Sequence, residues 1–297
     1  MMRIVYFLFW LIAGLISILP FRLLYVLSDL IYVAIYYITG YRRKVTYRNL
    51  RKAFPEMSKD EIRAIAKKFY KNLADLVVEV LKIRSISARA MDKRVVFKNY
   101  DIIERLYKEG KSIFVAIGHC GNWEWMGLRL AMISNHKPFA IVKPLTNEYF
   151  EGYMSQLRTK SGYNNLIKFK QTYRTLVRNR HQKNIVIIAS DQTPTRDEIN
   201  YWTRFMNQET PFFLGLEKMS KMLDMAVLFF DIVRVKRGHY EVNVKVITEQ
   251  PKETAEYEIT EKYVRQLEEA IRRKPDNWLW SHRRWKHAKE RSTENEG

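Results

Sequence analysis

Ser112-Ile113-Phe114-Val115-Ala116-Ile117-Gly118-His119-Cys120-Gly121-Asn122-Trp123-Glu124 is the stretch that decides the fold of this 297-residue chain. Its β-branched and aromatic first half predicts a buried strand over 111–117, and the apolar residues after it predict a helix over 123–133. His119 then lies in the turn at the carboxyl end of the strand. Open α/β sheets bind ligands at this end of their strands, so the stretch predicts both a fold class and a site.

The spacing of His119 and Glu124 favours a general base with an orienting acid. If the helix begins at Asn122 as its N-cap, Glu124 lies in the first turn and can fold back toward the imidazole. A carboxylate there would fix the ring tautomer and leave the other nitrogen free to accept a proton. A histidine that only caps the loop is the structural alternative. The side chain of Cys120 points away from His119 in an extended turn, so we do not expect a thiol nucleophile.

The net charge of +20 is extreme for this length, with 52 Lys and Arg against 32 Asp and Glu. Such a balance implies an anionic partner, which could be nucleic acid, anionic lipid, a phosphorylated substrate or an acidic protein. The single cysteine excludes an internal disulfide framework, and no Cys/His cluster suggests zinc. We therefore expect an enzyme that works without a metal.

The amino-terminal third predicts a membrane anchor. The uncharged run 4–19, extended to 21, would form a helix of about 27 Å, roughly the thickness of bilayer hydrocarbon. It ends without a small-residue cleavage site, so we expect it to be retained. The apolar stretch 23–41 contains Asp29 and is predicted to lie in the interface or to pack on the first helix, although it could also span. The basic residues after Tyr41 place the rest of the chain in the cytoplasm by the positive-inside rule.

The remaining pattern predicts a basic helical neck, a catalytic body and a tail. We divide the chain into a membrane anchor at 1–41, with its span at about 4–21, a neck at 42–91, a catalytic domain at 92–290 and a polar tail at 291–297. Ser58-Lys59-Asp60-Glu61 is a capping box that begins a helix in the neck. From 92 onward, strands and helices alternate, which predicts α/β layers around a largely parallel sheet with an antiparallel edge pair.

Two further polar features lie near predicted strand ends. Asp191 follows the apolar strand 184–190, where a turn residue is the structural alternative. Between Gly152 and Ser190 there are eight Lys or Arg and no acid, a density that predicts an anion-binding face. Those eight are Arg158, Lys160, Lys168, Lys170, Arg174, Arg178, Arg180 and Lys183.

With these residues in view, the chain resembles the lipid A biosynthesis late acyltransferases, which are lauroyl and myristoyl transferases. The resemblance covers nearly the whole length. It rests on the neck Arg42-Arg43-Lys44-Val45-Thr46-Tyr47-Arg48-Asn49-Leu50 with Ala53-Phe54-Pro55-Glu56, His119 with Glu124, Gln156-Leu157-Arg158, Ser190-Asp191-Gln192, and the ending Leu279-Trp280-Ser281-His282-Arg283-Arg284-Trp285-Lys286. The neck and the ending, found in order, are the most specific parts.

The resemblance implies a glycerolipid-acyltransferase-like mixed sheet flanked by helices, with an amino-terminal transmembrane helix, at the cytoplasmic face of the bacterial inner membrane. It implies acyl transfer from acyl carrier protein, or from acyl-CoA, to a hydroxyl of an anionic lipid A precursor during lipopolysaccharide biosynthesis, with no cofactor. The expected catalytic residues are His119, Glu124, Arg158 and Asp191. The expected substrate-binding residues are Asn122, Lys143, Lys168, Lys170 and Arg174.

Two positions depart from the family pattern. Lys143-Pro144 stands where many relatives have Arg-Pro, and Gln192-Thr193-Pro194 follows Asp191 where some have a second acid. Lysine keeps the charge but loses the bidentate fork, so phosphate recognition there should differ.

Three other functions compete with this interpretation. An O-acyltransferase acting on another membrane glycolipid or aminolipid is the main alternative. A membrane-tethered nucleic-acid binder would explain the charge but has no recognisable binding motif, so we expect no nucleic acid partner. A lipid hydrolase would need a G-x-S-x-G elbow that the sequence lacks.

Overall fold

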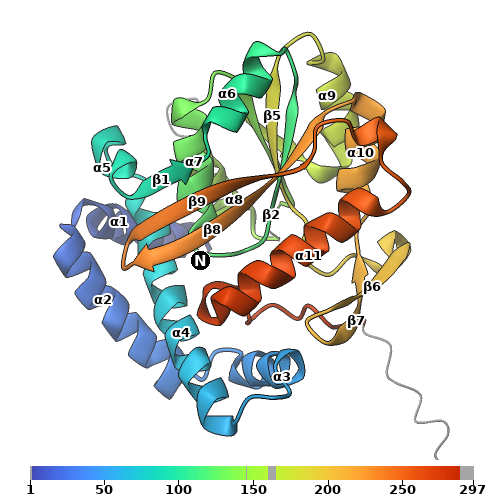
Figure 1. Ribbon diagram of the computed structural model, residues 1–297. Helices are drawn as coiled ribbons and strands as arrows, with labels where there is room; N and C mark the ends of the chain where they lie inside the picture. Colours follow the sequence, from blue (N-terminus) through green and yellow to red (C-terminus); the bar gives the residue numbers. More distant parts are fainter. Residues whose placement is uncertain (1, 145, 160–164, 288–297) are drawn as a thin grey trace, which may run out of the picture.

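A seven-stranded sheet forms the centre of the computed structural model, which describes residues 2–144, 146–159 and 165–287 (Figure 1). The strand order is β1-β9-β8-β2-β5-β3-β4, and β6 and β7 form a separate hairpin. The strands are β1 (Val95–Lys98), β2 (Ile113–Ile117), β3 (Lys137–Val142), β4 (Asn165–Lys168), β5 (Asn184–Ala189), β6 (Tyr201–Phe205), β7 (Gln208–Phe212), β8 (Ala226–Lys236) and β9 (His239–Thr248). The predicted mixed α/β fold with a helix-flanked sheet is therefore confirmed.

The pairing of the strands brings the carboxyl ends of five parallel strands to one edge of the sheet. β2 runs parallel to β5 and β8, and β3 runs parallel to β5 and β4. The antiparallel pair β8–β9 was expected at the edge of the sheet, but β1 pairs in parallel with β9 and lies outside it. That part of the prediction was wrong because β1 has only four residues, too few for a clear periodic signal.

Alternation along β2 separates the two faces of the sheet. Ile113, Val115 and Ile117 pack with α6 (Asp101–Lys108), α7 (Trp123–Ile133) and α8 (Glu148–Arg158). Phe114 and Ala116 pack on the other face with α10 (Gly215–Leu223) and α11 (Glu258–Arg273), which crosses the sheet in Figure 1. Every β2 side chain is buried because both faces are covered.

The amino-terminal helices divide differently from the prediction. α1 (Met2–Ile18) ends before Pro20, and α2 (Phe21–Val33) continues as a π-helical turn, η1 (Ala34–Ile38). Among the described helices, Phe21–Ile38 is the one long and apolar enough to cross a membrane, whereas Arg3–Ile18 is shorter. The continuous helix expected over 4–21 is therefore divided at Pro20, and the candidate span lies after it. Asp29 of α2 forms an ion pair with Arg237 at 2.7 Å, so its charge is compensated.

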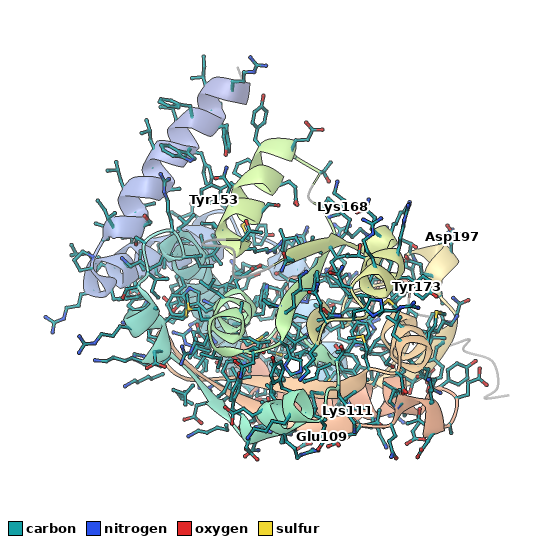
Figure 2. The ribbon with its side chains drawn as sticks, turned by 90° about the horizontal axis from the view of Figure 1, so that it is seen from above. Glu109, Lys111, Tyr153, Lys168, Tyr173 and Asp197 are labelled. Atoms are coloured by element: carbon teal, nitrogen blue, oxygen red, sulfur yellow. The ribbon has the colours of Figure 1, made fainter. Side chains whose placement is uncertain are left out.

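Both helices leave apolar side chains exposed on their outer faces. Ile4 and Leu15 of α1 and Leu30 of α2 are each more than 60% exposed. The inner face of α1 packs through Phe9 on Tyr153 of α8, with ring centroids 5.2 Å apart (Figure 2). The exposed apolar faces are those expected of a membrane-associated protein.

The neck packs against the sheet. It consists of α3 (Arg43–Ala53) and α4 (Lys59–Lys82), and the predicted capping box at Ser58 and Glu61 is present. Phe69 of α4 belongs to the same buried cluster as Phe114 of β2. The predicted tail at 291–297 lies outside the described residues.

Candidate active site

A tight turn joins β2 to α7 and presents His119. A Cβ at Gly118 would approach Leu267 Cδ1 to 2.5 Å, and Gly121 has a φ of +56°, so both positions favour glycine. Asn122 is the N-cap of α7, as predicted, and its Oδ1 accepts a hydrogen bond from Trp125 N at 2.9 Å. The turn therefore holds His119 between a buried strand and a capped helix.

Asp191 is the partner of His119. It follows β5, the parallel neighbour of β2, and its Oδ1 lies 2.6 Å from His119 Nδ1. Its Oδ2 accepts from the His119 backbone N–H at 2.7 Å and from Trp278 Nε1 at 2.8 Å. These contacts fix both the backbone and the ring of His119.

The charge of Asp191 sets the protonation of the pair. Burial of Asp191 favours its neutral form, but the charge of His119 and hydrogen bonds from His119 and Trp278 lower the pKa of Asp191 to about 2. Burial also opposes protonation of His119, yet the charge and hydrogen bond of Asp191 raise the pKa of His119 above 6.5. Because Asp191 is ionised, Nδ1 of His119 carries the proton and Nε2 is the basic nitrogen.

Gln192 occupies the basic side of the imidazole. Its Nε2 lies 3.2 Å from His119 Nε2 and donates to it. Trp123 packs edge-on against the ring at 4.9 Å between centroids. Beside His119 lies a cavity of about 20 Å³, bordered in part by Leu73 and Leu279, so a small polar group has room next to the ring. Sequence reasoning did not assign Gln192 a role.

Glu124 does not contact the imidazole, so the prediction that it orients His119 is corrected. Its Oε1 and Oε2 accept from Arg158 at 2.6 Å (Nη2) and 2.9 Å (Nε), a bidentate pair between the start of α7 and the end of α8. Burial of Arg158 opposes its charge, but Glu124 raises its pKa. Burial and Asp191 have the largest effects on the pKa of His119. Glu124 and Arg158 have smaller ones: Glu124 raises this pKa, and Arg158 lowers it. All four predicted catalytic residues therefore lie in one electrostatic site.

The side chain of Asn122 is fully buried and already engaged, which rules out its direct use in binding substrate. Its Nδ2 donates to Glu79 Oε2 at 2.8 Å, and the same oxygen accepts from Tyr240 at 2.7 Å. Burial raises the pKa of Glu79, although hydrogen bonds from Tyr240 and Asn122 oppose this.

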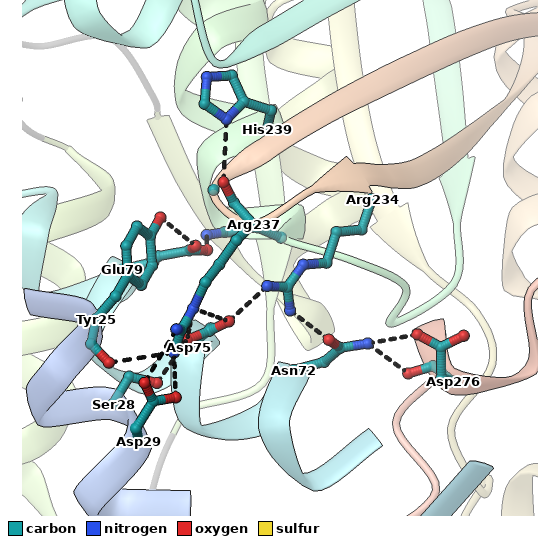
Figure 3. A network of polar contacts seen from close by, with 12 residues as sticks. Tyr25, Ser28, Asp29, Asn72, Asp75, Glu79, Arg234, Arg237, His239 and Asp276 are labelled. Atoms are coloured by element: carbon teal, nitrogen blue, oxygen red, sulfur yellow. Dashed lines mark hydrogen bonds and ion pairs between the residues drawn. The ribbon is translucent and has the colours of Figure 1, made fainter. Parts of the chain in front are cut away.

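A polar network continues from Glu79 to the amino-terminal helix (Figure 3). Tyr25 of α2 donates to Glu79 at 3.0 Å, and Ser28 donates to Asp75 at 2.5 Å. Arg237 bridges Asp75 and Asp29, at 2.7 Å to each. The helix that could cross a membrane is thus joined through Tyr25 and the buried Glu79 to Asn122, the cap of the active-site helix.

The carboxyl-terminal segment 276–286 forms another wall of the site. Leu279 N donates to His119 O at 3.1 Å, and Trp278 bridges Cys120 as well as donating to Asp191. Asn49 of α3 donates to the carbonyls of Trp280 and His282, both at 2.9 Å. Leu279, the first residue of the ending used for the family resemblance, thus holds the backbone of His119, and Trp278 just before it holds Asp191.

The predicted basic face lies farther along the same sheet edge. Lys143 follows β3, Lys168 ends β4, and the two strands are parallel neighbours (Figure 2). Lys143, Lys168, Lys170 and Arg174 are exposed and have no carboxylate partner among the described side chains, whereas Lys160 lies outside the described residues. Although burial of Glu198 opposes its ionisation, Thr195 and then the charges of Lys143 and Lys170 lower its pKa.

Cys120 is buried, and burial raises the pKa of its thiol well above 9. The thiol is therefore protonated and enclosed, which agrees with the expectation against a cysteine nucleophile. In the described part of the chain, no group of three or more His, Cys, Asp or Glu could hold a metal ion.

Comparison with known families now places this geometry. The family model described as bacterial lipid A biosynthesis acyltransferase matches residues 1–287, nearly the whole chain. Comparison with curated proteins gives no match to an individual relative. The match spans the apolar helices, the His119 turn and the carboxyl-terminal wall, and the chain belongs to the bacterial lipid A biosynthesis acyltransferase family, a family of acyltransferases.

Proposed function

We propose that the protein transfers a fatty acyl group from an acyl thioester, carried by acyl carrier protein or coenzyme A, to a hydroxyl of a lipid A precursor. The observation that carries the proposal is the hydrogen-bonded pair of the partly buried His119 with the buried Asp191 at the carboxyl end of β2, in a chain of this family. The exposed apolar faces of α1 and α2 and the basic residues after Tyr41 support a position on the cytoplasmic face of the inner membrane.

In the proposed mechanism, His119 is the general base. Asp191 holds the proton on Nδ1, so Nε2 can accept one from the acceptor hydroxyl, which takes the place of the Gln192 amide. The hydroxyl oxygen attacks the thioester carbonyl carbon. The tetrahedral intermediate collapses, the C–S bond breaks, and the leaving thiolate takes the proton back from the imidazolium. An ester and a free thiol result, and no covalent enzyme intermediate is needed.

Arg158 and the start of α7 would stabilise the oxyanion of that intermediate. The guanidinium is held in one orientation by its two hydrogen bonds to Glu124. The first backbone N–H groups of a helix have no intrahelical acceptor and carry partial positive charge. Donors held in place before the reaction stabilise a developing charge without reorganisation. Glu124 is thus a positioning residue for the cation.

The exposed basic face would bind the acidic carrier protein or the phosphates of the acceptor. Lys143, Lys168, Lys170 and Arg174 lie on the sheet edge that also carries the catalytic pair. An acidic partner docked there would bring its thioester toward His119.

The test is transfer of radiolabel by the purified full chain in detergent. Labelled acyl carrier protein and labelled acyl-CoA are each offered with a lipid A precursor, a glycolipid or an aminolipid. Label in the lipid A precursor, lost in His119→Ala, is the expected result. Label in another lipid would make the protein an acyltransferase with a different acceptor, and release of free fatty acid alone would make it a hydrolase.

A further inference from the structure

A second charged region of the molecule is separate from the catalytic pair. A cavity of about 1200 Å³ lies between α3, the β6–β7 hairpin and the end of the carboxyl-terminal segment. Its lining contains one carboxylate, Glu209, and six cations, which are Lys44, Arg48, Lys52, Arg204, Arg283 and Lys286. We call this the basic cavity.

The cations of the basic cavity have no carboxylate partner among the described residues, whereas those on α11 do. Lys44, Arg48 and Lys52 are spaced by four residues, so they lie on one face of α3, a helix without an acid. On α11 the same spacing joins opposite charges, as in the ion pair of Lys262 with Glu258 at 2.7 Å and that of Arg272 with Glu268 at 2.8 Å. Like charges at this spacing repel, so α3 tolerates a repulsion that an external anion would relieve.

An uncharged side chain in the cavity also lacks partners. Gln208 lines it, and both its Oε1 and its Nε2 are shielded from solvent without a hydrogen-bond partner among the described residues. A buried amide without partners is costly, and a ligand hydroxyl could both donate to and accept from it. The lining therefore suits a ligand that combines anionic groups with hydroxyls.

The size and position of the cavity narrow the range of possible ligands further. Its volume far exceeds what an inorganic phosphate fills and is slightly larger than the usual pocket for a small molecule, so it has room for a large headgroup. Arg283 lies five residues after Trp278, which donates to Asp191, so the two Cα atoms are at most about 18 Å apart. Thr193 Oγ1, close to the catalytic acid in sequence, also donates to the Arg283 carbonyl at 2.9 Å. A ligand held there can extend to His119.

We infer that the basic cavity binds the phosphorylated sugar headgroup of the lipid acceptor while a hydroxyl of the same lipid reaches His119. The inference rests on the proposed function and adds a location for the headgroup, apart from the basic face on β3 and β4. The cations would neutralise the phosphates, and Gln208 would meet a sugar hydroxyl.

Equilibrium binding by the full chain in neutral detergent tests this, in a His119→Ala background that prevents turnover. The probes are a bisphosphorylated lipid A precursor and the same lipid with its phosphates removed. Combining Arg48→Gln, Lys52→Gln and Arg204→Gln should weaken binding of the phosphorylated lipid about 10- to 100-fold, and binding of the dephosphorylated lipid should not change. All three side chains are exposed, so the fold should persist. The matched control combines Lys93→Gln, Lys108→Gln and Lys218→Gln, exposed lysines outside the cavity, and should bind like the parent.

Three results would overturn the inference. The first is that the cavity variant binds the phosphorylated lipid as tightly as the parent. The second is that the lysine control loses as much affinity for this lipid as the cavity variant does. The third is that the cavity variant loses as much affinity for phosphatidylglycerol vesicles as for the phosphorylated lipid, which would make the cavity a general lipid surface. A defect confined to acyl carrier protein binding would likewise assign the cavity to the donor. If the cavity variant weakens binding of the phosphorylated lipid as expected but the wild type transfers no acyl group to that lipid, the proposed function fails, while binding of the phosphorylated headgroup in the cavity stands.

Discussion

The catalytic pair and the basic cavity show two opposite uses of charge. His119 is partly buried and pairs at 2.6 Å with the buried Asp191, and the cation Arg158 has its own carboxylate. The cations of the cavity are exposed and have no such partner among the described residues. The charges near His119 are paired within the protein, as expected of groups positioned for catalysis. The cations of the cavity are unpaired within the described chain, as expected of groups that bind an anionic ligand. Changes in the first region should act on kcat, and changes in the second on binding.

The largest expected effect is loss of the base. His119→Ala should lower kcat about 10²- to 10⁴-fold because it removes a positioned proton acceptor. Adding Asp191→Asn should cost little more, since the two residues act as a unit. The measurement is steady-state transfer with saturating donor. Cys120→Ser should remain active, and a dead Cys120→Ser with an active His119→Ala would reverse the assignment.

Asp191→Asn alone should lower kcat about 10²-fold and move the pH profile. The base must be neutral, so activity falls as the pH drops through the pKa of His119, which Asp191 raises above 6.5. Removing that charge lowers the pKa, so the acidic limb of kcat should shift to lower pH. If the acidic limb of kcat does not shift, a group other than His119 sets the pH dependence.

Arg158→Lys should lower kcat by about 10-fold or more, because lysine keeps the charge but cannot form the two-point contact with Glu124. Glu124→Gln should lower kcat by a similar factor. In either variant, the cation at position 158 is no longer held in one orientation by two hydrogen bonds to a carboxylate. Comparing the pH profiles supplies the control: the acidic limb should change less than in Asp191→Asn. A kcat like that of the wild type would remove Arg158 from the mechanism.

The smallest expected effect concerns the basic face. Combining Lys168→Glu, Lys170→Glu and Arg174→Glu should raise KM for donor or acceptor several-fold with little change in kcat, and wild-type activity should fall with salt. Varying each substrate separately shows which one the face binds. If neither KM responds, these residues form only a solvated surface.

Local signals predicted the local structure around the candidate site. The strand before His119, the N-cap at Asn122 and the capping box at Ser58 are short-range features, and the structure confirms them. The division of the apolar run at Pro20 was not predicted, because the hydropathy of a run does not show where a helix is interrupted. The ion pair of Asp29 with Arg237 was not predicted either, since the two residues are far apart in the sequence. The hairpin β6–β7 was missed as well, although it forms one wall of the basic cavity.

By itself, the sequence determined which residues are candidates for the chemistry: a histidine and an aspartate after two apolar strands, an arginine near a helix end, and an excess of cations. Only the tertiary structure decided how they pair. Parallel pairing of β2 with β5 brings Asp191 to His119 across 72 positions of the chain, while Glu124, five residues from the histidine, turns to Arg158. Hydrogen bonding depends on distance in space, and sheet register sets that distance at a strand end.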